Sequence, residues 1–240
     1  MTTLVVGASG ATGRLLVEQL LARGESVRII VRSPDTLPEA FKQNENLTMI
    51  TASLLDLSNA DMAQHVDGCD AVASCLGHTI SWKGIYGQPR WLVTDATRRL
   101  CNAIRSNKSD VPTRFVLMNT AGNSNRDLHE TVSPGQQCII ALLRLLLPPH
   151  VDNEKAADYL RTQIGQNDGA IQWVAVRPDN LVNEDMVTEY EVHPSPTRSA
   201  IFDAGQTSRI NVGHFMADLI TDDGTWNRWK GQMPVIYNKG

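Results

Sequence analysis

The chain has few cysteines and few aromatic residues for its length. Its 240 residues include four cysteines, and aromatic residues make up 5% of the chain. Cys69, Cys75, Cys101 and Cys138 are scattered, without a pair at CxxC or metal-ligand spacing. No His, Cys or carboxylate residues follow a pattern typical of a metal site, so we expect no bound metal and no disulfide framework.

The chain also lacks a long apolar run and an excess of positive charge. Its longest apolar run, residues 138–147, contains Arg144 and has about half of the roughly 20 residues that a membrane-spanning helix requires. The net charge is −4, with acidic and basic residues mixed along the chain. We therefore expect neither a membrane span nor nucleic-acid binding. The N-terminus has no signal-peptide pattern, which favours a cytoplasmic protein.

What the chain does have is an alternation of short apolar runs and helical patterns. Near-continuous apolar runs are typical of strands that are buried on both faces of a parallel sheet. They predict strands at residues 4–6, 27–31, 47–50, 71–75, 115–118 and 173–176, and helices near residues 13–23, 58–66, 91–107, 152–164 and 211–221. This alternation predicts a doubly wound α/β fold with a parallel sheet, in a single domain over residues 1–240.

One segment near the C-terminus interrupts this alternation. Residues 183–206 are irregular and contain Pro194 and Pro196. Ligands of open α/β sheets bind at the carboxyl ends of the strands. We expect residues 183–206 to form a small cap over that edge, and residues 78–90 to form a second wall of the substrate site.

A further helix is predicted from its start signal. Ser133, Pro134 and Gln136 match the cap, the first helical position and the third position of a helix that continues to residue 147. This helix is apolar around most of its circumference. Such a helix is buried, covers a pocket, or contacts a partner protein or a second copy of the chain, and burial is the simplest of these alternatives.

The first predicted strand runs into three closely spaced glycines, Gly7, Gly10 and Gly13, and then into a helix. In a dinucleotide-binding loop, the first glycine allows a sharp turn and the second lets backbone N–H groups approach a pyrophosphate. The third lets the helix pack against the strand, and the helix N-terminus offers free donors to the anion. The loop and the first turn of the helix add the remaining predicted cofactor contacts of this segment, Ser9, Ala11, Thr12 and Arg14.

The end of the second predicted strand indicates which dinucleotide binds. An NAD site typically has an Asp or Glu about 20 residues after the glycines, where it accepts hydrogen bonds from the adenosine ribose. This chain has Arg32 and Ser33 at that position. A guanidinium beside a hydroxyl binds a 2′-phosphate, which a carboxylate would repel, so the sequence predicts NADP.

These residues resemble the atypical short-chain dehydrogenase/reductase family, in particular its single-domain NAD(P)H-binding branch with NmrA-like proteins and biliverdin reductase B-like flavin reductases. The resemblance covers nearly the whole chain, through residues 7–13, 31–33, 70–77, 115–121, 174–178 and 212–216. It implies a Rossmann fold and further cofactor contacts. By this resemblance, the adenine lies beside Ser53 and Leu54, the nicotinamide ribose beside Ser74, Cys75, Leu76 and Gly77, and the carboxamide near Pro178, Asn180 and Leu181.

The catalytic residues of the family are only partly present. Its reductases combine a Ser or Thr after the fifth strand with a Tyr-x-x-x-Lys pair, in which the Lys lowers the pKa of the Tyr. The resemblance aligns Thr120 with the hydroxyl and Lys155 with the lysine that also contacts the cofactor, but Val151 occupies the tyrosine position. His150 and His78 are candidate proton donors in its place, because imidazole titrates near neutral pH.

Three functions fit these residues. The leading hypothesis is an NADPH-dependent oxidoreductase that transfers a hydride to a flavin, a quinone or another conjugated small molecule without a catalytic tyrosine. The second is a non-catalytic NADP-binding redox sensor or assembly factor of the NmrA-like kind, in which cofactor binding changes a partner surface. The third, an isomerase or epimerase with tightly bound NADP, would require the tyrosine that Val151 replaces.

Overall fold

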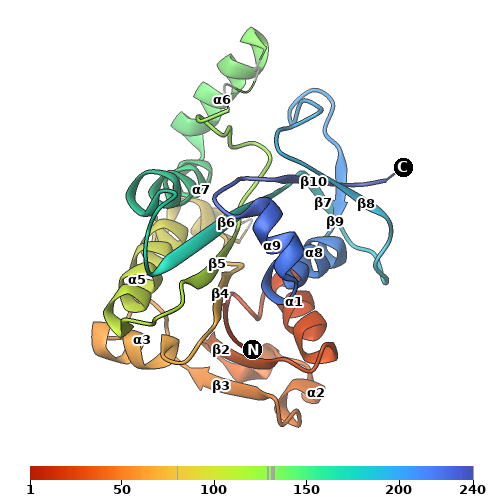
Figure 1. The fold of residues 1–240 in the computed structure, drawn as a ribbon. Coiled ribbons are helices and arrows are strands. Elements are labelled where there is room, and N and C mark those ends of the chain that lie inside the picture. Colours follow the sequence, from red (N-terminus) through yellow and green to blue (C-terminus); the bar gives the residue numbers. More distant parts are fainter. Residues whose placement is uncertain (80, 129, 131–132, 240) are drawn as a thin grey trace.

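The computed structural model describes residues 1–79, 81–128, 130 and 133–239, which form one eight-stranded sheet between two layers of helices (Figure 1). The strand order is β3-β2-β1-β4-β5-β6-β10-β8. Neighbours from β3 to β10 are parallel, and β8 is antiparallel to β10. The predicted doubly wound fold is confirmed. The strands are β1 (Thr2–Val6), β2 (Ser26–Val31), β3 (Leu47–Thr51), β4 (Ala71–Ser74), β5 (Thr113–Met118), β6 (Ile171–Pro178), β8 (Tyr190–His193) and β10 (Val235–Asn238).

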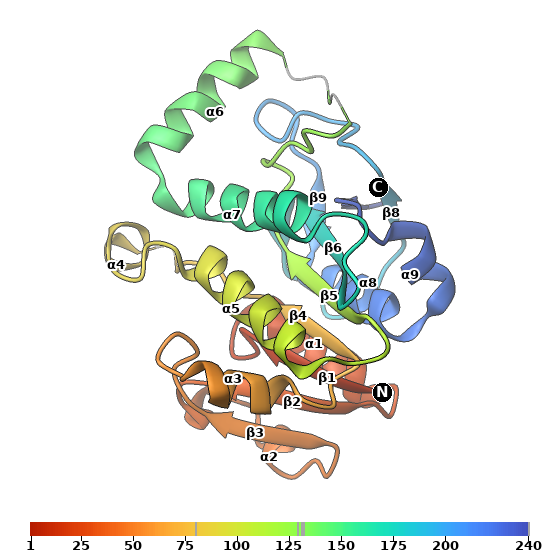
Figure 2. The same ribbon diagram turned by 60° about the vertical axis from the view of Figure 1, so that its left-hand side comes forward.

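Two groups of helices cover the two faces of the sheet, as Figure 1 and Figure 2 show. One face carries α1 (Ala11–Ala22), α8 (Arg209–Thr221) and α9 (Asp223–Trp229), and the other carries α3 (Asn59–Val66), α5 (Leu92–Asn107) and α7 (Pro148–Tyr159). Successive side chains of a strand point to opposite faces, so each strand contributes to both cores. In β1, for example, Val5 packs in the first core, and Leu4 and Val6 pack in the second.

The remaining elements are short, apart from one longer helix, α6 (Pro134–Leu146). They are a 3-10 helix η1 (Pro34–Thr36), α2 (Glu39–Lys42), α4 (Trp82–Tyr86), a π-helical turn η2 (Leu160–Ile164), and the paired strands β7 (Asn180–Val182) and β9 (Gln206–Ser208). No helix in the described part of the chain combines the length and the apolar character that crossing a bilayer requires.

The sequence signal for a helix start at Ser133 is confirmed, and Ser58 caps the start of α3 in the same way. The Ser58 hydroxyl accepts a hydrogen bond from the Asp61 backbone N–H (3.1 Å), and the Asp61 carboxylate accepts one from the Ser58 N–H (3.3 Å). The Ser133 hydroxyl accepts a hydrogen bond from the Gln136 N–H (3.2 Å) at the start of α6. These bonds satisfy N–H groups that have no partner within the helix.

Helix α6 is not buried, so the simplest expectation for this helix was wrong. Figure 2 shows it projecting from the top of the molecule, with α7 next to its C-terminal end. Ile140 is its one buried residue, and Leu145 is 79% exposed. Both faces of the sheet are already covered by the other helices, which leaves no core position for α6. Its other exposed side chains include Cys138, Leu142 and Leu146.

Residues 183–206 are not wholly irregular. Their central part forms β8, which pairs with β10 at the end of the sheet, and neither strand was predicted. The fully buried Arg177 of β6 donates a hydrogen bond to the Pro194 carbonyl (3.2 Å) and pairs with Glu130 (2.6 Å). The segment is therefore fixed to the edge of the sheet near the strand ends. Its role as a cap over a substrate remains a prediction.

Candidate functional site

A groove of about 570 Å³ lies along the carboxyl ends of β1, β2, β3 and β4. Ligands bind at this edge in open parallel sheets. The loops after β1, β3 and β4 and the end of β2 line it, and Leu92 at the start of α5 lies at its border. Nine residues that the sequence predicts for cofactor binding line the groove: Gly7, Ser9, Gly10, Arg32, Ser53, Leu54, Cys75, Leu76 and Gly77.

The glycine loop forms the floor of the groove through two very close backbone approaches. Gly7 has φ +79°, and a Cβ atom there would lie 2.6 Å from the carbonyl carbon of Cys75. A Cβ atom on Gly13 would lie 2.2 Å from the Gly7 carbonyl oxygen. The spacing between the strand, the loop and α1 therefore depends on residues without a side chain.

The N-terminus of α1 faces this loop without a side-chain cap. Gly10 is the N-cap residue and makes no side-chain hydrogen bond. The first N–H groups of α1 are thus available to an anion, as the dinucleotide motif requires. Ala11, Thr12 and Arg14 lie in this first turn. The Thr12 side chain is buried, whereas Arg14 is exposed and lies 3.9 Å from Glu18.

Arg32 is the cationic residue that lines the groove, at the end of β2. Its side chain is exposed, and no hydrogen bond or ion pair joins it to another described residue. The neighbouring Ser33 does not line the groove. Its hydroxyl caps η1 by accepting a hydrogen bond from the Asp35 N–H (3.3 Å) and donates to the Asp35 carboxylate (2.9 Å). Arg32 is therefore available to a phosphate group, and the hydroxyl of Ser33 is already bonded.

The loop after β3 is held by an arginine that the sequence analysis missed. Arg99 of α5 donates hydrogen bonds to the carbonyl oxygens of Leu54 (3.1 Å), Leu55 and Leu57. The predicted adenine contacts, Ser53 and Leu54, therefore lie on a loop whose backbone is held by hydrogen bonds from α5. In sequence, Arg99 is indistinguishable from a solvated arginine on a helix.

Thr120 and His150 lie close together beyond the end of β5. A Cβ atom on Gly122 would lie 3.6 Å from the Thr120 hydroxyl and 3.7 Å from Cε1 of His150, so the two side chains flank one point. Asn119 orients this turn, because its amide oxygen accepts from the Thr120 N–H (2.9 Å) and its amide group donates to the Asn153 carbonyl (2.9 Å). Neither Thr120 nor His150 lines the groove itself.

His150 also lies next to a carboxylate that is held in its charged form. Its Nε2 atom is 3.5 Å from Glu154, and Arg144 of α6 binds both oxygens of the same carboxylate at 2.8 to 3.1 Å. Burial alone would raise the pKa of Glu154, but His150 and Arg144 outweigh it and lower the pKa to about 2. Glu154 is therefore ionised at neutral pH.

The structure does not bring every predicted residue to the groove. Lys155 is exposed, and its Nζ atom lies 3.7 Å from the centre of the Trp91 ring rather than along the groove. Val151 is half-buried on α7, in the position expected for a tyrosine. Eight further predicted cofactor contacts also lie outside the groove lining: Ala11, Thr12, Gly13 and Arg14 at the start of α1, and Ser74, Pro178, Asn180 and Leu181.

The local structure around Ser74, Pro178, Asn180 and Leu181 accounts for their positions outside the groove lining. Ser74 is fully buried at the end of β4, and its hydroxyl has no partner among the described residues. The Pro178 carbonyl accepts a hydrogen bond from the Ala121 N–H (2.9 Å). Asn180 and Leu181 form part of β7, which pairs with β9. Their predicted contacts with the nicotinamide remain predictions. Residue 80, in the predicted wall 78–90, lies outside the described residues.

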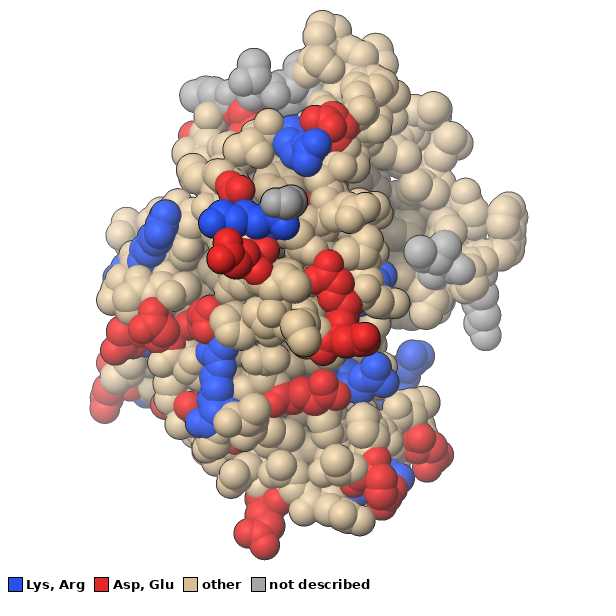
Figure 3. Space-filling view, turned by 90° about the vertical axis from the view of Figure 1, so that its right-hand side faces the viewer, with Lys and Arg blue, Asp and Glu red and all other residues tan. Residues whose placement is uncertain are grey.

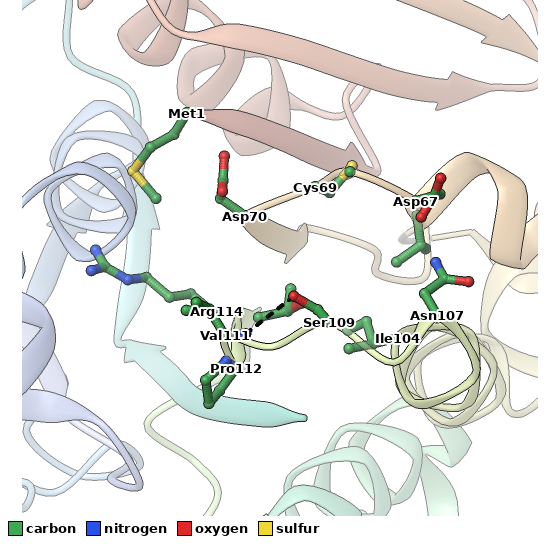
Figure 4. A pocket seen from close by; sticks show the side chains of 13 residues that line it. Met1, Asp67, Cys69, Asp70, Ile104, Asn107, Ser109, Val111, Pro112 and Arg114 are labelled. Carbon is green, nitrogen blue, oxygen red and sulfur yellow. Dashed lines mark hydrogen bonds between the residues drawn. The ribbon is translucent and has the colours of Figure 1, made fainter. Parts of the chain in front are cut away.

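A second cavity of about 350 Å³ lies at the opposite edge of the sheet (Figure 4). Two of its charged side chains, Asp70 and Arg114, already have partners in the protein. Asp70 accepts a hydrogen bond from the Thr2 N–H (2.7 Å), and Arg114 donates to the Ile220 carbonyl (2.8 Å) and pairs with Asp223. None of the predicted site residues lines this cavity. In the described residues, no three His, Cys, Asp or Glu side chains converge as they would around a metal ion.

A comparison with protein families identifies the class of ligand. Residues 7–223 match the model of a family described as NAD(P)H-binding. The chain belongs to the NAD(P)H-binding family. This confirms the resemblance drawn from the sequence.

A plant protein is a distant relative of this NAD(P)H-binding protein. The chain is 26% identical over 194 residues to an uncharacterised chloroplastic protein of Arabidopsis thaliana, a match that covers 80% of this chain. It spans 64% of that relative, less than two thirds of its length.

Several solved structures share the fold. A short-chain dehydrogenase/reductase of Veillonella parvula in complex with NADP has a TM-score of 0.71 at 16% identity, covering 100% of this chain and 95% of that one. A Streptococcus pneumoniae protein assigned as an NADH-flavin reductase has a TM-score of 0.68 at 19% identity, covering 100% of both chains. An oxidoreductase of Lactococcus lactis has a TM-score of 0.70 at 16% identity, covering 100% of this chain and 91% of that one.

Proposed function

We propose that this protein is an NADPH-dependent reductase that transfers a hydride to a flavin, a quinone or another conjugated small molecule. The observation that carries the proposal is a groove lined by nine of the predicted cofactor residues, combined with Val151 in place of the catalytic tyrosine. Reduction of a conjugated acceptor depends mainly on a correctly positioned hydride donor. It depends less on a tyrosine that donates a proton. The shared fold with a protein assigned as an NADH-flavin reductase supports the same class of acceptor.

The residues of the groove fit NADPH. Gly7 lets the loop lie against the backbone of Cys75 and Gly13 lets α1 lie against the loop, and the first turn of α1 offers free N–H donors to the pyrophosphate. Arg32 would bind the 2′-phosphate, and Ser53 and Leu54 would contact the adenine. When bound, NADPH supplies the hydride.

His150 is the proton donor in this proposal, and Thr120 orients the acceptor beside it. The two side chains flank the same point, and the ionised Glu154 lies beside the imidazole ring. In the other candidate, His78, both ring nitrogens face oxygen atoms of the protein. His150 is therefore the better placed of the two to give a proton to a reduced acceptor.

The function is tested by following the loss of reduced-nicotinamide absorbance when the purified protein is mixed with NADPH and a panel of flavins, quinones and aldehydes. We expect turnover with at least one conjugated acceptor. His150→Gln should lower kcat by about a hundredfold, because general acid catalysis contributes at least this much, and leave the Kd for NADPH unchanged.

The matched control for His150→Gln is His214→Gln. His214 lies on α8, where it contacts Tyr190 (2.9 Å) and Asp218 (3.3 Å) far from Thr120 in the fold. This variant should turn over as the wild type does. Equal kcat values for all three proteins would rule out His150 as the proton donor.

A second candidate function is an NADP-binding regulatory protein, and the exposed face of α6 favours it. Leu142, Leu145 and Leu146 are 53%, 79% and 49% exposed on this projecting helix. The one charged residue of α6, Arg144, is already paired with Glu154. In Figure 3, charged side chains are frequent over the lower part of the face shown and sparse along its upper right margin. An apolar surface of this kind is typical of a protein contact.

For this second function, tight NADPH binding without turnover should accompany self-association that NADPH alters. Sedimentation of the wild type and of L142E/L145E, each with and without NADPH, measures the association. The charged variant should remain monomeric, because glutamates in an apolar contact are costly to bury. V111E is the control, since Val111 is 71% exposed and lies before β5, away from α6. Turnover by a protein that is monomeric throughout excludes this candidate.

A further inference from the structure

His78 forms a buried contact directly behind the wall of the dinucleotide groove. Its neighbours in sequence, Gly77 and Thr79, both line the groove, whereas the His78 ring turns inward. Its Nε2 atom lies 2.8 Å from the Asp152 carboxylate of α7, and its Nδ1 atom lies 3.1 Å from the Gly84 carbonyl of α4. The wall after β4 is therefore attached to two helices through one imidazole ring.

Asp152 also caps the helix that borders the groove. Its side chain is fully buried, and its two carboxylate oxygens accept hydrogen bonds from the N–H groups of Val93 (2.8 Å) and Thr94 (2.9 Å). The Thr94 hydroxyl donates to the Asp152 carbonyl (2.9 Å). The N-cap residue of α5, Trp91, provides no side-chain cap, so α7 supplies the cap that α5 lacks.

The surroundings of Asp152 favour its charged form. Burial raises the pKa of this carboxyl group, but hydrogen bonds from His78, Thr94 and the Val93 backbone outweigh burial, and the pKa lies below its ordinary value. A negative charge at the N-terminus of α5 is also favourable to the helix dipole. Neutral asparagine in its place would present an amide donor to N–H groups that need an acceptor.

We infer that Asp152 is a positioning residue for the cofactor. It acts through His78 on the wall after β4 and through the first N–H groups of α5 on Leu92, and both of these elements line the groove. The inference rests on the proposed function, because it assumes that the groove binds NADPH. Arg32 follows β2, which is separated from β4 by β1 in the sheet. Asp152 therefore affects the part of the groove near β4 and leaves the 2′-phosphate end unchanged.

The experiment compares two ligands. NADPH occupies the whole groove, whereas 2′,5′-ADP carries only the adenosine half with the 2′-phosphate. Asp152→Asn should weaken NADPH binding by about tenfold, because hydrogen bonds to a charged group are lost, and change 2′,5′-ADP binding by less than about twofold. Titration calorimetry with each ligand gives both values. Loss of folding alone would lower both affinities by the same factor. The ratio of the NADPH affinity to the 2′,5′-ADP affinity would then stay unchanged.

Further variants distinguish a positioning role from other causes. His78→Gln should reproduce the tenfold loss for NADPH, and the double variant should lose little more than either single variant, because both act through one contact. Arg32→Ala should weaken both ligands. The inference is overturned if Asp152→Asn and His78→Gln leave NADPH affinity unchanged, or if they weaken 2′,5′-ADP as much as NADPH. Wild-type protein that binds neither ligand would instead contradict the proposed function.

Discussion

Replacing Gly7 with alanine should weaken NADPH binding by about a hundredfold or more. The positive φ of Gly7 (+79°) costs an alanine roughly 1–2 kcal/mol. In addition, the new Cβ atom would lie 2.6 Å from both the carbonyl carbon and the oxygen of Cys75. Relief of that contact requires the loop after β1 to move away from the end of β4, and both line the groove. Fluorescence titration of reduced nicotinamide measures the change in Kd.

The chain offers a closely matched control for this substitution. Gly24 has φ +78°, but a Cβ atom there would have no neighbour within 4 Å. Gly24→Ala therefore has the same backbone cost without the contact, and it should lower the free energy of unfolding by about 1 kcal/mol while leaving NADPH affinity unchanged. If both variants bind NADPH equally well, the close approach of Gly7 to Cys75 is not what binding requires.

Arg32→Asp should reverse the preference between the two nicotinamide dinucleotides. NADPH affinity is expected to fall by about a hundredfold or more, since charge-assisted hydrogen bonds to the 2′-phosphate are replaced by repulsion. NADH should bind as well as before or better, because a carboxylate at this position accepts hydrogen bonds from the ribose hydroxyls. Parallel titrations with NADPH and NADH measure the ratio of the two affinities.

An exposed arginine elsewhere provides the control for Arg32. Arg98 lies on α5, 3.8 Å from Asp95, and does not line the groove. Arg98→Asp makes the same change in net charge and should leave both affinities unchanged. Equal weakening of NADPH and NADH by Arg32→Asp would contradict the assignment of NADP, whatever the protein does with the cofactor.

Strands β1 to β6 could be predicted from the sequence, and the far edge of the sheet could not. Strands β1 to β6 are apolar runs separated by helical patterns, so their parallel arrangement follows from local signals. β8 and β10 are four residues each, and β8 contains Glu191 and His193. Their pairing depends on contacts across 40 or more residues, which no local pattern reports.

Helix α6 shows a different limit of sequence patterns. An apolar helix is usually buried because burial of leucine side chains is favourable. Burial also requires an open position on the core, and α1, α8 and α9 on one face and α3, α5 and α7 on the other occupy these positions. Composition predicts which helices would be stabilised by burial. Only the three-dimensional arrangement determines which of them find an open position on the core.

The candidate site likewise contains some residues that sequence patterns predict and others that they miss. The predicted residues that follow β1, β3 and β4 line the groove, because parallel strands bring their carboxyl ends to one edge, whereas those that follow β5 and β6 do not line it. Asp152 and Arg99 were missed because each acts on a loop or helix distant in sequence. Asp152 is followed by Asn153 and Glu154, so in sequence it has the pattern of an exposed helix face. Lys155 was assigned by the family resemblance, which does not determine the direction of a long side chain.

The projection of α6 from the body gives the protein a single reactive thiol. Cys69, Cys75 and Cys101 are buried, and burial raises the pKa of Cys75 to about 12, so its nucleophilic thiolate is scarce. Cys138 is exposed on α6. An alkylating fluorophore or spin label added to the folded protein would therefore attach at Cys138 first. The native chain thus carries its own site for a spectroscopic reporter on α6, without any engineered cysteine.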